Sequence, residues 1–108
     1  MKGKIVLIPF PFTDLAGSKR RPALVLIQSE NDVVVAYISS NTSIHNDACL
    51  LIGAGHPSFE KTGLKTSSVI RLDKVATVLT DLIVGELGEA DVTLRREING
   101  RLAQIYKI

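Results

Sequence analysis

Short apolar runs separated by turn-forming residues fill the first three-quarters of the chain, and their lengths are those of β-strands. They predict strands at 4–10, 22–29, 33–40, 48–52, 66–72, 74–79 and 83–87. The first run ends near Pro9, and the second begins at Pro22, a position where a strand tolerates proline. A turn at 30–32 joins the second run to the third, so these two strands are expected to pair antiparallel. The runs 66–72 and 74–79 are also compatible with one bent strand.

The hydrophobic period changes near the C-terminal end. Four apolar side chains recur there at intervals of four, four and three residues, which places them on one face of a helix. They are Leu94, Ile98, Leu102 and Ile105. Short strands followed by one amphipathic helix predict a mainly β fold, a small barrel or curled sheet covered by a C-terminal α-helix.

Composition favours one folded domain of 108 residues. Apolar residues make up 45% of the chain and charged residues 22%, so intrinsic disorder is excluded. Cys49 is the one cysteine, which rules out an internal disulfide and suits a reducing compartment. No apolar run approaches the roughly 18 residues of a membrane span, and a signal-peptide pattern is missing. We therefore expect a cytoplasmic protein without membrane association.

The net charge of +2 is unevenly distributed. Residues 1–30 hold five Lys and Arg against two Asp and Glu, a balance of +3, whereas 31–70 sum to −1 and 71–108 to zero. The excess is concentrated in Lys19, Arg20 and Arg21. A basic segment of this kind suits a phosphate or an acidic partner, although a solvated turn has the same composition.

Other kinds of chemistry find little support. His45, Cys49 and His56 lack the closely spaced ligand pairs of a zinc site and are interpreted as surface histidines and a buried thiol. No glycine-rich phosphate-binding signature opens a helix, and no Gly-x-Ser-x-Gly elbow is present. We expect neither a metal ion nor a cofactor.

Polar residues gather at the ends of the predicted second and third strands. Pairing through the turn at 30–32 matches positions whose numbers sum to about 62, so position 22 or 23 is expected to face 39 or 40. Arg21 would then lie beside Ser39 at one rim of the sheet. A guanidinium beside a hydroxyl can bind phosphate, but the same pair also suits an ordinary solvated hairpin end.

Four motifs follow one another along the chain: GKIVLIPFPFTD, KRRPALVL, VAYISSN and SSVIRLDKVATV. Together, from Gly3 to Val78, they resemble the PemK/MazF family of toxin ribonucleases from bacterial toxin–antitoxin pairs. The Arg-Pro-Ala triplet before an apolar run is the most specific element, and the closing LRREINGRLAQIYKI fits the family's C-terminal helix. The resemblance implies a small SH3-like β-barrel, with residues 1–108 as one toxin domain that forms a homodimer.

The resemblance also implies an activity. Members of the family cut single-stranded RNA without a metal, leaving a 2′,3′-cyclic phosphate and a 5′-hydroxyl, and thereby inhibit translation and growth. A cognate antitoxin is expected to restrain the toxin by placing an acidic segment in its basic groove.

Four residues match catalytic positions of the family. Arg21 matches the arginine before the proline, and Ser39 matches a hydroxyl residue that is usually threonine. Arg71 and Asp73 match an Arg-x-Asp pair that the plasmid-maintenance branch uses for catalysis and RNA contact. A surface ion pair on one strand face explains the last two residues equally well.

RNA contacts are expected from the loop and from the strand ends: Phe12, Thr13, Ser18, Lys19, Arg20, Ser40 and Asn41. Phe12 suits base stacking or packing in the barrel. The chain departs from the family pattern in two respects. Serine at position 39 is less restrained than threonine, and the loop before Arg21 lacks a histidine that some members have.

Two readings without catalysis compete with the nuclease. Small barrels of this type also serve as gyrase-poisoning toxins, so the chain could be a binding module for gyrase or another protein. A structural domain without a nucleic-acid role is the third interpretation.

Overall fold

The computed structural model describes residues 1–9 and 19–108. The order of elements is β1 (Lys4–Pro9), β2 (Arg20–Gln28), β3 (Asp32–Ser39), β4 (Cys49–Ile52), α1 (Phe59–Thr62), β5 (Ser68–Leu79), a 3₁₀ turn η1 (Thr80–Leu82), β6 (Gly85–Glu89) and α2 (Val92–Ile105). The prediction of a mainly β fold with a C-terminal helix is confirmed. None of the helices in the described ranges has the length and apolar character needed to cross a membrane.

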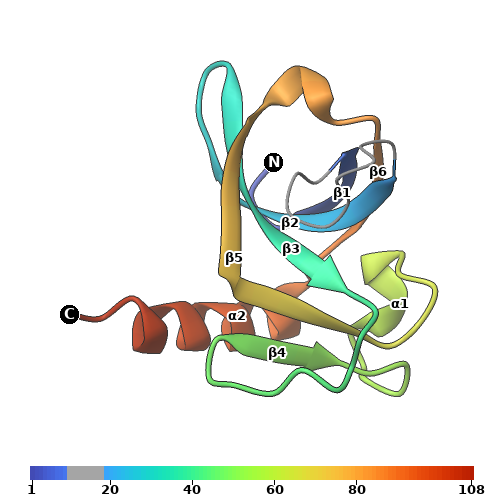
Figure 1. The fold of residues 1–108 in the computed structure, drawn as a ribbon. Coiled ribbons are helices and arrows are strands. Elements are labelled where there is room, and N and C mark those ends of the chain that lie inside the picture. The colour runs from blue at the N-terminus through green and yellow to red at the C-terminus, as the bar shows by residue number, and fades with distance from the viewer. Residues whose placement is uncertain (10–18) are drawn as a thin grey trace.

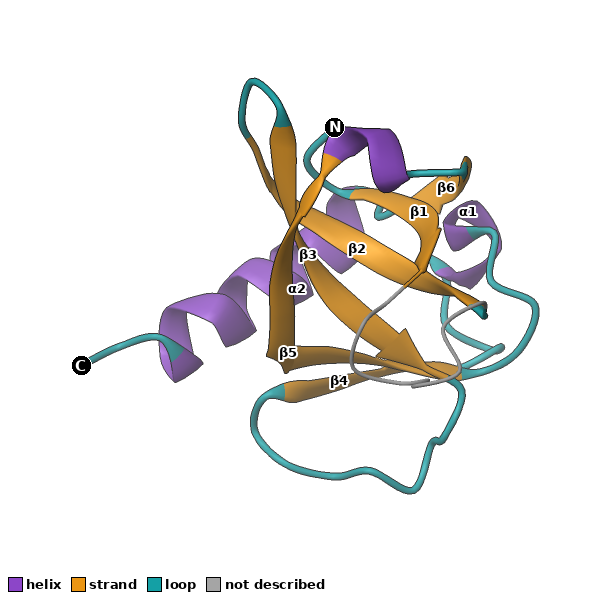
Figure 2. Ribbon diagram, turned by 45° about the horizontal axis from the view of Figure 1, so that its top comes forward, coloured by secondary structure: helices purple, strands orange, loops and turns teal. Residues whose placement is uncertain are grey.

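The six strands form one antiparallel sheet in the order β4-β5-β3-β2-β1-β6. The chain passes from β5 through η1 to β6, which pairs with β1 at the far edge, so the sheet curls into a half-barrel (Figure 1). Helix α2 lies across one side of the sheet, behind β2 and β3 in Figure 2.

Two hydrophobic cores lie on opposite faces of the sheet. Side chains of β2 alternate between them: Leu24 belongs to the core under α2, whereas Ala23 and Val25 belong to the core inside the curl. The predicted helical stripe is confirmed, because Leu94 and Ile98 are buried in the core under α2. Each face of the central strands therefore has its own buried layer.

Several boundaries differ from the sequence-based expectations. Strand β2 begins at Arg20 rather than at position 22, because Arg20 and Arg21 pair with Pro9 and Ile8 of β1. The runs 66–72 and 74–79 form one strand, β5, bent where its register with β3 shifts. Helix α1 lies between β4 and β5, where no helix was predicted, since four residues are too few to show a helical period.

Gly63 ends α1 in a conformation that favours glycine. Its φ is +73°, and a Cβ at this position would overlap the backbone carbonyl of Leu87 in β6. Gly88 has the same role from the other side, because a Cβ there would meet the backbone of Lys61 and Thr62. The two glycines let α1 and β6 approach backbone to backbone.

We predict that Gly63→Ala lowers the free energy of unfolding by about 2 kcal/mol or more, because the methyl group meets backbone in a left-handed conformation. Gly55→Ala is the matched control, since no atom lies within 4 Å of a Cβ there, and its effect should stay within about 0.5 kcal/mol. Urea unfolding followed by circular dichroism measures both changes. Equal stability of the two variants would contradict the close approach of α1 and β6.

Candidate functional site

The pairing of β2 with β3 determines where Arg21 lies relative to Ser39. Ala23 faces Tyr37, so paired residue numbers sum to 60 rather than to the predicted value of about 62. The expectation that position 22 or 23 faces 39 or 40 is therefore wrong: the turn already pairs Gln28 with Val33, a sum of 61, and a bulge at Leu26 lowers the sum by one more. Continued by two residues, the observed register places Arg21 directly across from Ser39.

The same register brings further polar residues to this face of the sheet. Tyr37 faces Ala23 on one side and Arg71 of β5 on the other. Opposed residues of antiparallel strands project from the same face, so Arg21, Ser39 and Arg71 project from one face. Because β3 lies between β2 and β5, the Cα atoms of Arg21 and Arg71 are separated by about two strand spacings, roughly 10 Å, and by two residues along the strand. Two arginine side chains can contact one phosphodiester segment across this distance.

Arg21 carries a buried donor that the described part of the chain does not satisfy. Its Nε atom is buried and has no hydrogen-bond partner among the described residues, although the residue as a whole is half-buried. A buried donor without a partner costs about 1–3 kcal/mol, and the large majority of buried polar groups are paired. An anionic ligand that accepts from the guanidinium would remove this cost.

Ser39 is 6% exposed, and its hydroxyl is held by the chain that follows. Ser39 Oγ accepts a hydrogen bond of 3.0 Å from the backbone N–H of Asn41. Because a hydroxyl both accepts and donates, its proton is left for an acceptor such as a phosphate oxygen. The bond from Asn41 also restrains the serine side chain, and so offsets the lost restraint of a β-branched threonine.

Arg71 and Asp73 form a bidentate ion pair. Nε and Nη2 of Arg71 donate to the two carboxylate oxygens at 2.9 and 2.8 Å. The side chain of Arg71 is 13% exposed and that of Asp73 is 33% exposed. The hydrogen bonds from Arg71 hold the pKa of Asp73 below its usual value and raise the pKa of Arg71. Asp73 is therefore a weak base that keeps Arg71 in place.

Helix α2 supports this pair through the backbone. Tyr106 donates its hydroxyl proton to the carbonyl of Leu72, the residue between Arg71 and Asp73, at 2.6 Å. Arg101 Nη1 donates to the carbonyl of Cys49 at 2.7 Å. Neither role is predictable from the sequence, since periodicity alone does not assign hydrogen bonds to residues near the end of a helix.

Of the predicted RNA contacts, Lys19, Arg20, Ser40 and Asn41 are exposed. Arg20 and Lys19 lie next to Arg21 in sequence, while Ser40 and Asn41 follow Ser39, so the structure brings these four residues to the same ends of β2 and β3. The remaining predicted contacts, Phe12, Thr13 and Ser18, lie outside the described residues.

A pocket of about 320 Å³, which we call the Arg21 pocket, opens beside these strand ends. Its lining comprises Leu7, Arg21, Pro22, Ile38, Ser40, Gly63, Leu64, Lys65, Thr66, Ser68 and Leu87. Lys65 and Thr66 carried no signal in the sequence, because they follow α1 and are far from Arg21 along the chain.

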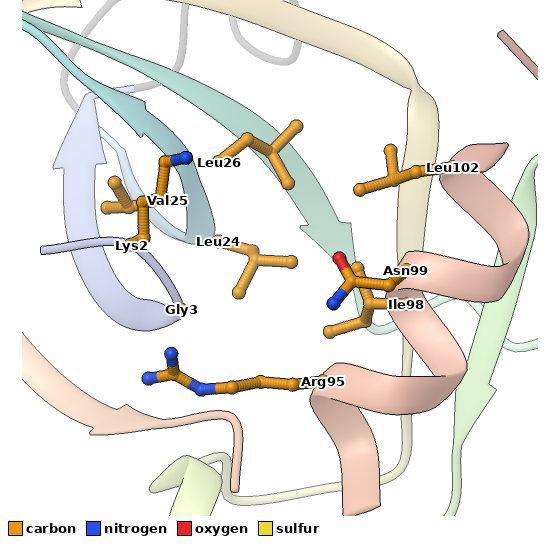
Figure 3. A pocket seen from close by; sticks show the side chains of 9 residues that line it. All are labelled: Lys2, Gly3, Leu24, Val25, Leu26, Arg95, Ile98, Asn99 and Leu102. Atoms are coloured by element: carbon orange, nitrogen blue, oxygen red, sulfur yellow. The ribbon is translucent and has the colours of Figure 1, made fainter. Parts of the chain in front are cut away.

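A second pocket, of about 340 Å³, lies between the start of the sheet and α2 (Figure 3). Leu24 and Leu26 project from the sheet toward the helix, and Arg95 extends beneath Gly3. The charge of Arg95 is already engaged, because its Nε donates to the carbonyl of Ala90 and its Nη2 lies 3.7 Å from Glu89. This pocket is consequently a weaker anion site than the Arg21 pocket.

The residues considered for a metal site have other surroundings. His45 is exposed and Cys49 is buried, and burial raises the pKa of the Cys49 thiol. His56 Nε2 lies 3.0 Å from Glu97, and His56 Nδ1 accepts from the backbone N–H of Ser58. Within residues 1–9 and 19–108, no group of three or more His, Cys, Asp and Glu side chains is arranged to hold a metal ion.

Solved toxin structures share this fold. An endoribonuclease in complex with its cognate antitoxin from mycobacterial species superposes with a TM-score of 0.70 at 22% sequence identity, over 96% of this chain and 91% of that one. The Mycobacterium tuberculosis toxin MazF-mt6 gives a TM-score of 0.72 at 17% identity, over 94% and 93%. No curated protein sequence matches the chain.

The half-barrel with its C-terminal helix is thus the fold of the MazF-type toxins. Residues 1–106 match the model of the PemK-like, MazF-like toxins of type II toxin–antitoxin systems, and the chain belongs to this family. The family resemblance noted from the sequence motifs is confirmed.

We predict that Asp73→Asn lowers the free energy of unfolding by about 1–2 kcal/mol at pH 7, because it leaves the half-buried Arg71 without its carboxylate. The folded-state pKa of Asp73 lies below the ordinary 3.8. Its contribution is therefore fully present above 3.8 and disappears as the pH falls through the folded pKa. Urea unfolding of both proteins between pH 7 and pH 2.5 should show the difference shrinking below pH 4; a constant difference would contradict this assignment.

Proposed function

We propose that the chain is a toxin endoribonuclease that cleaves single-stranded RNA and thereby inhibits translation and growth. The observation that carries the proposal is the buried Nε of Arg21, which has no hydrogen-bond partner within residues 1–9 and 19–108. The register of β2 with β3, continued to the strand ends, puts Arg21 across from Ser39. Membership of the PemK-like, MazF-like toxins supports it, as does the description of a mycobacterial neighbour as an endoribonuclease in complex with its antitoxin.

The proposed reaction is attack of a ribose 2′-oxygen on the adjacent phosphorus. A P–O2′ bond forms, the P–O5′ bond breaks, and the products carry a 2′,3′-cyclic phosphate and a 5′-hydroxyl. The 2′-hydroxyl proton passes to water, and the leaving 5′-oxygen takes a proton from water. Negative charge grows on the non-bridging oxygens, so groups that bind this charge lower the barrier.

Arg21, Ser39 and Arg71 supply such groups. Arg21 donates two parallel hydrogen bonds to the phosphate, and Ser39 donates its hydroxyl proton to a phosphate oxygen. Arg71 is a second clamp, which Asp73 holds in position through the bidentate pair. Arginine keeps its proton in proteins, so Arg21 acts by electrostatics rather than as a base. None of these roles requires a metal ion.

RNA on either side of the reacting phosphate would contact the basic and polar strand ends. Lys19 and Arg20 are placed to bind phosphates, and Ser40 and Asn41 to bind base edges or ribose. Phe12, Thr13 and Ser18 complete the proposed contact set on the basis of the sequence. The proposed partners are a cytoplasmic RNA, a second copy of the chain in a homodimer, and an antitoxin whose acidic segment competes for the same basic surface.

We predict that Arg21→Ala lowers the rate of RNA cleavage by about 10²–10³-fold, because it removes the main donor to the transition-state phosphate. Ser39→Ala should lower it less, by about tenfold, since one neutral hydrogen bond is lost. Arg96→Ala, an exposed arginine of α2, is the matched control and should keep full activity. Cleavage of a long single-stranded RNA with mapping of both new ends gives the readout, and circular dichroism checks folding.

Folded wild-type protein that binds an antitoxin or a topoisomerase but leaves RNA uncut would overturn the nuclease in favour of the binding module. Equal cleavage by wild type and Arg21→Ala would instead reject the assignment of Arg21.

We further predict that cleavage persists unchanged in excess EDTA, because the transition-state charge is bound by guanidinium and hydroxyl groups. The same RNA is incubated with and without chelator, and the 3′ ends are tested for a cyclic phosphate. Loss of activity on chelation, restored by a divalent cation, would contradict the metal-independent reaction.

A further inference from the structure

Tyr37 lies on β3, the strand between those that carry Arg21 and Arg71. Its paired residues are Ala23 of β2 and Arg71 of β5, and Ser39 follows two residues later on the same strand. Residues two apart on a strand project from one face, separated by about 7 Å along it, and directly paired side chains begin about 5 Å apart. Tyr37 therefore projects from the same face as the proposed catalytic side chains, with its ring against the core inside the curl.

The phenol of Tyr37 lies within range of the Arg71 charge. The pKa of Arg71 is raised mainly by its hydrogen bonds to Asp73, and in smaller part by the neighbouring Tyr37. Side chains of a strand stand perpendicular to the sheet and lean along the strand direction. A phosphodiester bound at Arg21 and Ser39 would therefore have the Tyr37 hydroxyl on the side of Arg71.

Among the described residues of this face, the other polar groups are poor proton donors at neutral pH. Arginine keeps its proton in proteins. Asp73 is ionised, because hydrogen bonds from Arg71 lower its pKa, and so it has no proton to give. The alcohol of Ser39 is a weaker acid than a phenol. A phenol is protonated at neutral pH and is a stronger acid than a ribose hydroxyl, so it can protonate an alkoxide that leaves phosphorus.

Arg71 has donors left for the phenolate that such a transfer produces. A guanidinium carries five N–H donors, and Asp73 accepts from two of them, one on Nε and one on Nη2. The remaining donors include both protons of Nη1. Hydrogen bonds from a cation to an oxyanion are about twice as strong as neutral ones. Arg71 therefore binds the phenol oxygen of Tyr37 more strongly as the proton departs, which favours the transition state over the ground state.

We propose that Tyr37 is the general acid of the cleavage reaction and donates its hydroxyl proton to the leaving 5′-oxygen. As the P–O5′ bond breaks, its electron pair stays on the 5′-oxygen and forms the new O–H bond. The phenolate then takes a proton from water, and the hydroxide so formed neutralises the proton released by the 2′-hydroxyl. This inference rests on the proposed function and deepens it, because it assigns to this chain a proton transfer otherwise left to water.

The test compares wild type with Tyr37→Phe, which keeps the ring and removes the hydroxyl, on two RNA substrates. On ordinary single-stranded RNA, Tyr37→Phe should lower kcat about 10²-fold with KM nearly unchanged, since general acid catalysis supplies at least that factor. In the second substrate, sulfur replaces the bridging 5′-oxygen at the cut mapped for wild type. A thiolate leaves without a proton, so Tyr37→Phe and wild type should cut this substrate at the same rate.

Two further variants separate proton donation from phosphate binding and from positioning. Arg21→Ala should be slow on both substrates, because the phosphate carries the same charge in each. Tyr106→Phe removes the other phenol of the chain, which acts through the backbone carbonyl of Leu72. Any loss of activity in Tyr106→Phe should therefore be equal on the two substrates.

Equal cleavage of ordinary RNA by Tyr37→Phe and wild type would overturn the general acid and leave the nuclease standing. An equal loss of activity on both substrates would also overturn it, since that result marks a role in binding or in folding. Wild type that leaves ordinary RNA uncut rejects the nuclease itself, and the general acid with it. Urea unfolding of Tyr37→Phe, followed by circular dichroism, checks that the variant is folded.

Discussion

The register between β2 and β3 is the constraint on which the site depends. A slip of one residue would turn every side chain of a strand to the opposite face, and Arg21 would then be separated from Ser39 by the sheet. The register is held by burial on both faces: Ala23, Val25 and Val35 fill the core inside the curl, Leu24 and Ala36 fill the core under α2, and a slip would exchange the two sets and disrupt the packing of both layers. The core thus determines the geometry of the polar face at the strand ends.

The two arginines of this face differ in their hydrogen bonding: Arg71 is held in an ion pair, and Arg21 is the one better placed to bind a ligand. Arg71 has its charge satisfied by Asp73 in two short hydrogen bonds, whereas Arg21 has a buried Nε that the described chain leaves unpaired. Proteins violate the rule of satisfied buried groups mainly at functional sites, where a ligand completes the bonding. An anion beside Arg21 would meet a donor that has already been desolvated by folding.

Helix α2 contributes to the site without touching it. Its apolar stripe covers the core beneath the sheet, while Arg101 and Tyr106, the residue that follows the helix, bind backbone carbonyls of β4 and β5. Tyr106 donates to the carbonyl of Leu72, the residue between Arg71 and Asp73, and so restrains the backbone that carries the ion pair. Rigid support of this kind matters for catalysis because small misplacements of a charged group reduce its effect on the transition state.

The sequence by itself determined the strands, the helical stripe from Leu94 to Ile105, and the position of Arg21 and Ser39 at the ends of two paired strands, because these depend on local periodicity and on one hairpin. Its motifs indicated the family. Only the tertiary structure decided the true register, which the bulge at Leu26 shifts, and the ion pair between Arg71 and Asp73. It also decided that Lys65 and Arg21 line the same pocket. The curl of the sheet and the approach of α1 to β6 bring those residues together, and contacts between distant segments leave no periodic signal in the sequence.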